Sequence, residues 1–441
     1  MILAVDQGTT GTTCLVVDDE LNVRGRGYVP VSLATPRPGW VEQDPEELWT
    51  SVERAAEVAL ADAGITAADL DALGIANQRE TTIVWDRRSG EPVYPAIVWQ
   101  DRRTAERCRD LPAERIRTRT GLTCDPYFSA TKLEWILRET GACGDLAFGT
   151  VDSWLVWKLT RGAVHATDVT NASRTMLIDL TTLDWDDELL ALFSLDRSIL
   201  PAVHPSAHEF GEGRLLGATV PIGGIAGDQQ ASLHAHGTAK VTIGTGAFLL
   251  VPSAAPAPHG LIRTASVEGF ALEGSVFAAT AALEWVRALT GADPFLSAVD
   301  STKGVYFVPA LTGLGSPHWS PDARGRITGL SLTTRREHLV RAALESIAYQ
   351  VLDVVDALPD RPAVLGADGG ATANGFLMQF LADALQLPVE VAAEREMTAL
   401  GAAALIRPDA PPRAVAARYE PGADVSALVA GWRDAIRRTV V

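Results

Sequence analysis

"LAVDQGTTGTTCLVVD", residues 3–18, places glycine and threonine between two apolar runs. The first run ends at the acidic residue Asp6, and the residues from Gln7 to Thr13 are all Gly or Thr except Gln7 itself. The second run begins at Cys14 and ends at Asp18. Short apolar runs bounded by turn residues predict two buried strands joined by a tight turn. This turn would be lined by hydroxyl groups and would carry a carboxylate at its mouth.

Such a turn is chemically suited to a phosphate chain. Glycines let the backbone N–H groups come close, and threonine hydroxyls add donors without positive charge. A carboxylate at the strand end can hold Mg²⁺ against the phosphates. An ordinary hairpin is the alternative, because Gly/Thr turns are common. The absence of a following GK[ST] and of a following helix excludes a P-loop and a dinucleotide fingerprint.

Composition limits the classes of protein that this chain can represent. A length of 441 residues predicts two or three domains. The net charge of −17 argues against a nucleic-acid partner or an anionic membrane surface. The four cysteines match neither a zinc pattern nor a disulfide framework, so we expect reduced thiols and a cytoplasmic location. No apolar run is long enough to cross a bilayer, so no membrane insertion is expected. The "HAH" of His234 and His236 is interpreted as surface.

The first half of the chain alternates helix and strand patterns, which predicts an α/β fold. Residues 45–63 predict a helix with Asp44 as N-cap, Glu47 completing a capping box, and Gly64 as the stop. Residues 70–78 and 81–86 predict buried strands.

The second half repeats the theme of the opening hairpin. "AKVTIGTGAFLLV", residues 239–251, is again a strand, a Gly/Thr turn and a strand. Residues 333–358 predict a long helix, with Thr334 and Glu337 as a capping box, and residues 363–385 predict a strand, a glycine turn and a helix. Two similar halves indicate a duplicated domain with a nucleotide between the copies, and two ordinary hairpins are the alternative. We place the boundary near residue 225, which gives domains 1–225 and 226–441.

Further strings carry a specific resemblance, and they occur in order along nearly the whole chain. They include "NQRETTIVWD" (77–86), "AIVWQDRR" (96–103), "DPYFSATKLEWIL" (125–137), "TDVTNASRTML" (167–177), "GIAGDQQAS" (224–232), "VYFVPALTGLGSPHW" (305–319), "DGGATANGFLMQF" (368–380) and "TALGAAAL" (398–405). Together with "DQGTTGTT" they resemble the glycerol kinases of the FGGY carbohydrate kinase family. The resemblance implies two actin-like, ribonuclease-H-type α/β domains with an interdomain active-site cleft that closes on ATP, Mg²⁺ and a polyol.

The resemblance also implies which residues contact the nucleotide and the metal. The opening turn would be the first phosphate loop, "IGTG" at residues 243–246 the second, and "GGATAN" the adenosine side. The implied nucleotide contacts are Gly8, Thr9, Thr10, Gly244, Thr245, Gly370 and Asn374, and the implied metal ligands are Asp6 and Asp228.

The same resemblance assigns the catalytic and polyol-binding residues. Asp228 would be the general base that accepts the proton of the attacking hydroxyl; taken alone, its position before a helical run also fits an N-cap. The implied polyol contacts are Arg79, Glu80, Trp99, Tyr127, Asp228, Gln229 and Phe248. Without the resemblance, a surface ion pair and ordinary core aromatics are the alternatives for these residues.

Three positions depart from the family pattern. Thr13 stands where many members have an arginine beside the first phosphate loop. Thr280 and Glu284 stand where the family has a Gly and a Gln near the nucleotide. The stretch "GEGRLLGATVPI", residues 211–222, shows no glycine-rich loop of the kind linked to fructose-bisphosphate control in some members.

The expected function is ATP-dependent phosphorylation of glycerol to sn-glycerol 3-phosphate. The alternatives are an FGGY kinase for another polyol or sugar such as xylulose, and a homologue that binds nucleotide and polyol without catalysis. We expect a small-molecule substrate and no nucleic-acid partner. Both a homodimer and a homotetramer are compatible with the sequence.

Overall fold

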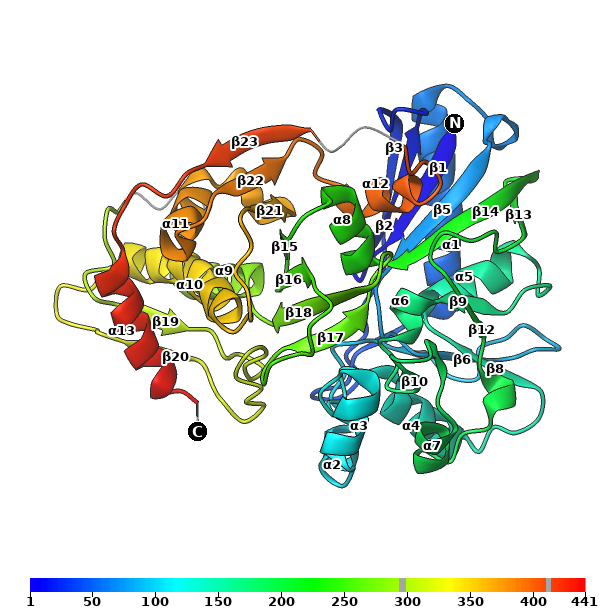
Figure 1. Ribbon diagram of the computed structural model, residues 1–441, viewed down its shortest axis with the longest axis horizontal. Coiled ribbons are helices and arrows are strands. Elements are labelled where there is room, and N and C mark those ends of the chain that lie inside the picture. The colour runs from blue at the N-terminus through cyan, green and yellow to red at the C-terminus, as the bar shows by residue number, and fades with distance from the viewer. Residues whose placement is uncertain (293–298, 410–413, 441) are drawn as a thin grey trace. The chain divides into compact units, whose positions relative to one another are not determined.

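The computed structural model describes residues 1–292, 299–409 and 414–440 of the chain (Figure 1). These residues form two compact units. Unit 1 comprises Met1–Ala235, Arg263–Phe270 and Glu396–Pro412, and unit 2 comprises His236–Ile262, Ala271–Arg395 and Arg413–Val441. Each unit is an α/β structure built on its own mixed sheet, as the sequence predicts. The division into functional domains at residue 225 stays a prediction.

The main sheet of unit 1 has six strands. Their order is β13 (Glu212–Leu215), β14 (Ala218–Gly227), β5 (Ala72–Asn77), β1 (Ile2–Gln7), β2 (Gly11–Val17) and β3 (Val23–Pro30). Strands β14, β5 and β1 are parallel, and the others pair antiparallel. The opening stretch therefore forms the predicted hairpin, in which Asp6 lies opposite Thr13.

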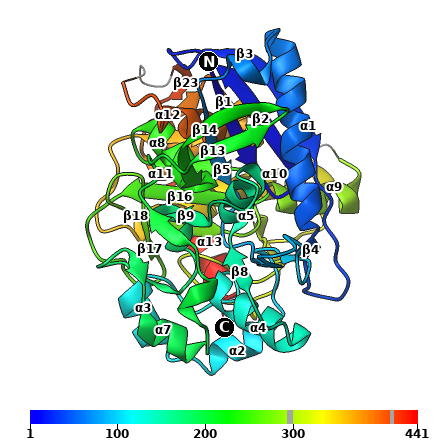
Figure 2. The ribbon, with the colours of Figure 1, turned by 90° about the vertical axis from the view of Figure 1, so that its right-hand side faces the viewer.

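Helix α1 (Pro45–Ala63) covers β2 and β3 on one face of this sheet (Figure 2). A side chain at Gly27 would come within 2.0 Å of the carbonyl oxygen of Ala55, so the glycine permits the close approach. Asp44 caps α1 by accepting the N–H of Glu46 at 2.9 Å. The predicted capping box is wrong, because the Glu47 carboxylate instead accepts the N–H and the hydroxyl of Ser32.

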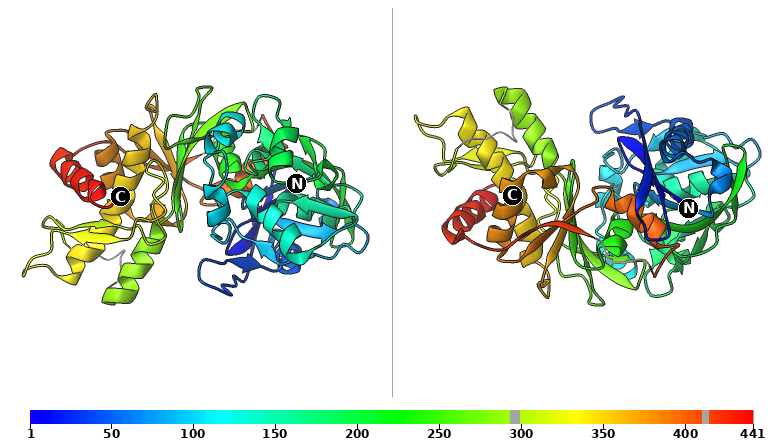
Figure 3. Two further views of the ribbon diagram at one scale, coloured as in Figure 1. Left: turned by 90° about the horizontal axis from the view of Figure 1, so that it is seen from below. Right: turned by 90° about the horizontal axis from the view of Figure 1, so that it is seen from above.

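The other face of the unit 1 sheet is covered by α12 (Met397–Ala404), a segment from far along the chain. It packs on β1 and β5, and it appears in orange beside the blue strands in the right-hand panel of Figure 3. Gly74 of β5 allows this contact, since a Cβ atom there would lie 2.4 Å from the carbonyl oxygen of Ala402. Apolar residues from both elements, including Ala76 and Ala399, are fully buried at this contact.

Smaller elements complete unit 1. They are strands β4 (Glu42–Gln43), β6 (Ile83–Asp86), β7 (Ala96–Ile97), β8 (Leu146–Gly149), β9 (Ala166–Asp168), β10 (Ile178–Asp179), β11 (Asp184–Trp185) and β12 (Ala202–His204), and helices α2 (Ala105–Arg109), α3 (Ala113–Thr120), α4 (Ser129–Thr140), α5 (Val151–Leu159), α6 (Val169–Ala172), α7 (Asp187–Leu192) and α8 (Asp228–His236), with 3₁₀ turns at Ala67–Asp69 and Arg197–Ile199. Strand β17 (Ile262–Ala265) contributes its last three residues to this unit.

The sheet of unit 2 repeats the pattern of an antiparallel hairpin beside parallel strands. Neighbouring strands run in the order β18 (Phe270–Val276), β16 (Ala247–Pro252), β15 (Lys240–Ile243), β21 (Leu365–Asp368), β22 (Val389–Ala392) and β23 (Val415–Tyr419). Strands β15, β21 and β22 are parallel. Strands β15 and β16 form the predicted second hairpin.

Helices and a small hairpin complete unit 2. They are α9 (Thr280–Thr290), α10 (Arg336–Asp356), α11 (Gly375–Leu385) and α13 (Ser426–Arg437), the 3₁₀ turn Gly370–Ala373, and the pair β19 (Tyr306–Val308) and β20 (Arg326–Thr328). The buried core of the unit lies around α10, which packs against α9 and α11. No described helix is both long enough and apolar enough to span a bilayer.

Two local predictions in unit 2 are wrong. The capping box of Thr334 and Glu337 does not form at the start of α10; the Arg335 N–H instead donates to Nδ1 of His338 at 3.0 Å. His236, which was interpreted as surface, is buried, and its Nε2 lies 2.7 Å from a carboxylate oxygen of Asp368. A carboxylate distant in sequence thus gives this imidazole a buried partner.

Candidate active site

The carboxyl ends of three parallel strands meet at one edge of the unit 1 sheet. Gln7 at the end of β1 pairs with Asn77 at the end of β5, and Asn77 pairs with Gly227 at the end of β14. The segments that follow these strands carry most of the predicted site residues of unit 1. Ligands of α/β sheets bind beyond the carboxyl ends of the strands, so this edge is the candidate site.

Asp228 follows β14 directly and is the first residue of α8. Its Oδ1 accepts the N–H of Gln229 at 2.7 Å and lies 3.1 Å from Nε of Arg79, while Oδ2 accepts the Gln229 side-chain amide at 3.1 Å. An N-cap carboxylate accepts the amide two or three residues ahead, whereas this one accepts the adjacent amide. The Asp228 side chain is 26% exposed, so it remains open to a ligand.

Arg79 is buried beneath this carboxylate. Its Nη1 donates to Oε1 of Gln230 at 3.2 Å. Gly227 makes room for it, because a Cβ atom there would lie 2.7 Å from both Cγ and Cδ of Arg79. The alternative of a surface ion pair for Arg79 and Glu80 is wrong, since the two residues are only 3% and 1% exposed.

Glu80 adopts a backbone conformation that is uncommon for a residue with a side chain. Its φ is +63°, which places it in the left-handed region. The hydroxyls of Ser129 and Thr82 donate to its carbonyl oxygen at 3.0 and 3.1 Å. Its Oε1 accepts from Nε of Arg174 at 2.5 Å. Such conformations persist where the surroundings over-determine them, and they cluster at functional sites.

Two predicted aromatic contacts adjoin the opening turn. The indole Nε1 of Trp99 donates to Oγ1 of Thr9 at 2.9 Å. The ring of Trp99 meets that of Tyr127 edge to face, with centroids 5.6 Å apart. Tyr127 is 3% exposed, whereas Trp99 is half-buried. A hydrogen bond and a ring contact therefore link the predicted polyol wall to the predicted phosphate turn.

The opening turn itself is held by backbone and side-chain amides. The Gly8 N–H donates to the Gly11 carbonyl at 3.0 Å, and the Gln43 side chain donates to the Thr9 carbonyl at 2.8 Å. Gln78 in turn donates to Oε1 of Gln43 at 2.9 Å. Asp6 and Gly8 are partly exposed and Thr10 is exposed. The turn thus has a fixed base and an accessible rim.

The predicted nucleotide contacts of unit 2 also follow parallel strands. The Gly244 and Thr245 carbonyls accept the N–H groups of Thr280 and Ala281 at 3.1 and 3.2 Å, so the turn after β15 binds the start of α9. Gly370 begins the turn after the neighbouring strand β21, and a Cβ atom there would meet nothing within 4 Å. Asn374 closes that turn.

The other two predicted site residues of unit 2, Asn374 and Phe248, lie at a helix start and within the sheet. The Oδ1 of Asn374 caps α11 by accepting the Leu377 N–H at 3.0 Å. Phe248 lies in β16 between Thr242 and Ser275 of the neighbouring strands and is partly buried.

The departures from the family pattern differ in their surroundings. Thr280 is the first residue of α9, and its N–H donates to the Gly244 carbonyl of the turn after β15. Glu284, one turn further along, is 55% exposed and lies 2.8 Å from Nη2 of Arg287. Only Thr280 of these two is therefore in contact with a predicted nucleotide loop. Thr13 lies in β2 opposite Asp6 and is partly buried.

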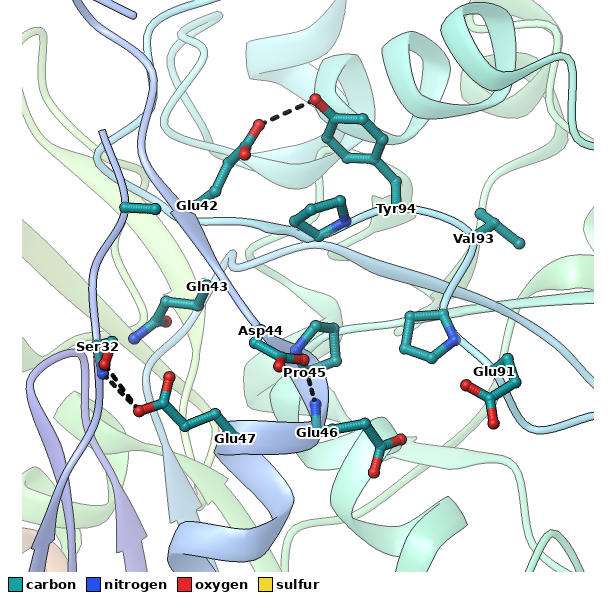
Figure 4. Close-up of a pocket in the computed structure, with 13 residues that line it drawn as sticks. Ser32, Glu42, Gln43, Asp44, Pro45, Glu46, Glu47, Glu91, Val93 and Tyr94 are labelled. Atoms are coloured by element: carbon teal, nitrogen blue, oxygen red, sulfur yellow. Dashed lines mark hydrogen bonds between the residues drawn. The ribbon is translucent and has the colours of Figure 1, made fainter. Parts of the chain in front are cut away.

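A separate cavity of about 590 Å³ lies beside the start of α1 (Figure 4). Its lining includes the carboxylates of Glu42, Asp44, Glu46, Glu47 and Glu91. Glu42 accepts the Tyr94 hydroxyl at 3.0 Å. Gln43, which also lines the cavity, donates to the Thr9 carbonyl of the opening turn.

Several buried residues that support the site were not singled out from the sequence. Arg174 and Asp168 are fully buried within "TDVTNASRTML", and Gln230 lies in "GIAGDQQAS". Asp168 accepts the hydroxyls of Thr170 and Ser206, both at 2.6 Å, and burial raises its pKa. The family strings were the available signal, since a charged residue in a local stretch of sequence does not disclose its distant partner.

Comparison with known proteins identifies the family. The model of the N-terminal domain of the FGGY family of carbohydrate kinases matches residues 1–234, and that of the C-terminal domain matches residues 239–406. A glycerol kinase of Azotobacter vinelandii is 47% identical over 92% of this chain and 88% of its own length. Glycerol kinase 1 of Clostridium tetani is 44% identical over 100% of this chain and 98% of its own.

Solved structures agree with these relatives. A Plasmodium falciparum glycerol kinase solved with ADP superposes with a TM-score of 0.88 at 33% identity, covering 100% of this chain and 98% of that one. A xylulose kinase of Brucella ovis gives a TM-score of 0.86 at 26% identity, covering 99% and 97%. This chain belongs to the FGGY family of carbohydrate kinases.

Proposed function

We propose that this chain transfers the γ-phosphoryl group of ATP to glycerol and forms sn-glycerol 3-phosphate. The observation that carries the proposal is the hydrogen bond from Trp99 Nε1 to Thr9 Oγ1. Phosphoryl transfer needs the acceptor hydroxyl next to the terminal phosphate. This bond joins the predicted polyol wall to the predicted phosphate turn. The glycerol kinases at 44–47% identity over most or all of the chain support the choice of glycerol.

In this proposal Asp228 is the general base. Its carboxylate accepts the proton of the attacking glycerol hydroxyl as the oxygen approaches the γ-phosphorus in line. The adjacent Gln229 amide and Arg79 guanidinium hold both carboxylate oxygens in place. A fixed orientation lowers the entropic cost of reaching the reactive geometry.

The remaining hydroxyls of glycerol would be bound by the buried pair Arg79 and Glu80 together with Tyr127 and Gln229. Burial strengthens such charge-assisted hydrogen bonds and excludes a competing water. The ring of Trp99 would pack on the carbon side of the molecule, and Phe248 of unit 2 stays a predicted apolar contact.

ATP would be bound by backbone and hydroxyl groups. Gly8, Thr9 and Thr10 would bind the terminal phosphates, and Gly244, Thr245, Gly370 and Asn374 stay the predicted nucleotide contacts of unit 2. The open space above Gly370 suits close approach by a ligand. The ADP in the Plasmodium falciparum structure supports a nucleotide ligand.

Mg²⁺ is implied by the family, and the residues of the first unit suit it. Asp6 and Asp228 offer partly exposed carboxylate oxygens, which are the ligands that Mg²⁺ prefers. Among the described residues no group of three acidic, His or Cys side chains could hold a metal, so phosphate oxygens and water would complete the coordination. When bound, the ion neutralises charge on the phosphates.

Two measurements test the proposed function. ADP formation is followed with glycerol, xylulose and longer polyols in the presence of ATP and Mg²⁺, and binding of glycerol and ATP is titrated by calorimetry. We expect the highest kcat/KM with glycerol. A higher value with xylulose would establish the sugar kinase alternative, and binding of both ligands without ADP formation would establish the non-catalytic one.

A further inference from the structure

We propose that Arg174 is a positioning residue for polyol recognition, which acts through Glu80 and Tyr127. The inference rests on the proposed function, because it assigns Arg174 to the same polyol pocket. It adds a residue that lies far from Glu80 and Tyr127 in sequence. Arg174 follows α6, in a segment that is buried throughout from Thr170 to Arg174.

The guanidinium of Arg174 is bound to the Glu80 carboxylate. Its Nε lies 2.5 Å from Oε1, and the two side chains are 0% and 2% exposed. Taking both charges out of water is costly, and the pairing offsets part of that cost. Another nearby cation, Arg79, keeps its Nε at 4.0 Å from the same Oε1. Arg174 is therefore the closer guanidinium to this Glu80 oxygen.

The same guanidinium contacts the aromatic side of the predicted pocket. Its central carbon lies 5.4 Å from the ring centroid of Tyr127 and 5.1 Å from that of Phe128. A planar, weakly hydrated guanidinium can bind a carboxylate and face aromatic rings at the same time, which an ammonium group does less well. One buried group thus contacts two predicted polyol ligands.

The backbone and the carboxylate of Glu80 are held by different residues. A left-handed conformation at a residue with a side chain is strained, and it persists only where the surroundings impose it. Ser129 and Thr82 fix the carbonyl oxygen of Glu80, and Arg174 fixes its carboxylate. Without Arg174 the backbone of Glu80 would remain held, while its carboxylate could leave the orientation that a polyol requires.

Neighbours of Arg174 anchor the same segment to the strand ends. The Gly227 N–H donates to Oγ1 of Thr170 at 2.8 Å. Asn171 and Asn77 exchange two side-chain hydrogen bonds of 3.0 Å. The segment is thereby held against the ends of β14 and β5. In this segment it is Arg174 that contacts predicted polyol ligands through its side chain.

The test compares Arg174→Lys and Arg174→Gln with the wild type by steady-state kinetics in glycerol and in ATP. Arg174→Lys keeps the charge but loses the planar fork. We expect it to raise the KM for glycerol by about tenfold or more, while kcat and the KM for ATP change by less than about threefold. Arg174→Gln should raise the glycerol KM further. Thermal unfolding is measured on every variant.

Arg107 offers a control in the same unit, with a side chain that is 31% exposed. Its Nε and Nη2 donate to both carboxylate oxygens of Glu134 at 2.8 and 2.9 Å, and neither residue belongs to the predicted site. Arg107→Lys therefore makes the same chemical change in another arginine–glutamate pair. We expect its glycerol KM to stay within about twofold of the wild type.

A second readout separates positioning from stability. Competition by 1,2-propanediol and 1,3-propanediol, each lacking one hydroxyl of glycerol, is measured in wild type and in Arg174→Lys. If Arg174 has a positioning role, the substitution should weaken the binding of glycerol more than the binding of at least one diol. That diol lacks the hydroxyl whose contact is affected. An equal loss of affinity for glycerol and for both diols, or an unchanged glycerol KM, would overturn the inference. So would an unfolded Arg174→Lys, which would assign the residue to stability alone. Absence of glycerol turnover in the wild type would instead reject the proposed function.

Discussion

Nε of Arg79 lies 3.1 Å from Oδ1 of Asp228, and the buried arginine side chain is 2% exposed whereas the aspartate is 26% exposed. The pair joins residues 79 and 228 across the ends of two neighbouring parallel strands. The buried cation orients a carboxylate whose outer side stays accessible. This arrangement suits a base that must contact a small hydroxylated ligand. The roles of Arg79 and Asp228 can be tested separately by substituting one residue at a time.

Asp228→Asn is expected to lower kcat by roughly 10²- to 10⁴-fold, because the amide keeps the shape of the side chain but cannot accept the proton. Glycerol binding, followed by calorimetry, should remain. Asp187→Asn is the control, since Asp187 also begins a helix and lies 3.0 Å from an arginine nitrogen. A variant of Asp228 that kept more than about half of the wild-type kcat would contradict the base assignment.

Arg79→Ala is expected to raise the KM for glycerol more than the KM for ATP. A buried charge-assisted hydrogen bond contributes roughly 1.5–3 kcal/mol, which corresponds to an effect of about 10- to 150-fold. Equal changes in both KM values would place Arg79 on the phosphate side or in a structural role.

Gly227→Ala should also raise the KM for glycerol, as Arg79→Ala does, but without removing the charge of Arg79. Its new methyl group would lie 2.7 Å from the Arg79 side chain and displace it. Gly422→Ala serves as the control, because the nearest atom to a Cβ there is 3.8 Å away. If Gly227→Ala left the glycerol KM at the wild-type value, the position of Arg79 would not matter for glycerol.

Thr280→Gly is expected to lower the KM for ATP, whereas Glu284→Gln should leave it within about twofold. Thr280 contacts the second phosphate turn through its own N–H, and glycine would remove a β-branched side chain from that position. Glu284 is exposed and paired with Arg287. The measurement is the KM for ATP, GTP and pyrophosphate in each single variant and in the double variant. A larger effect from Glu284→Gln would show that this carboxylate faces the donor.

Asp152→Asn is expected to weaken the pH dependence of stability between about pH 4 and 7. Burial, and then the charge of Asp168, raise the pKa of Asp152 to about 7. The folded state therefore holds a proton that the unfolded state releases near its ordinary pKa, so this carboxyl makes stability fall as the pH rises through the window. The contribution is of the order of a few kcal/mol.

Thermal unfolding from pH 4 to 8 tests the Asp152 prediction. The amide cannot ionise, so the variant should show a smaller loss of Tm across the window than the wild type. The exposed Asp110, substituted in the same way, should follow the wild-type curve. Identical pH profiles for wild type and Asp152→Asn would show that Asp152 is ionised across this range in the folded protein.

The sequence by itself determined the elements of this protein and the family to which it belongs. Both Gly/Thr hairpins, helix α1 with its caps at Asp44 and Gly64, and the strand, turn and helix around Gly370 follow from local patterns, because apolar periodicity and turn residues act over a few positions. The strings around Arg79 and Asp228 resemble the FGGY family, and the family models match the same parts of the chain.

Only the tertiary structure decided which distant side chains meet. The pairs Arg79–Asp228, Glu80–Arg174 and His236–Asp368 join residues separated by about a hundred positions or more, and burial selects such partners by charge compensation rather than by spacing. Tertiary packing also explains the wrong capping box of α1, because Glu47 accepts hydrogen bonds from Ser32 instead. The wrong capping box of α10 is a local shift by one residue, from Thr334 and Glu337 to Arg335 and His338. Periodicity fixes where a chain forms a helix or a strand, whereas the partner of a polar group is fixed only when the elements pack.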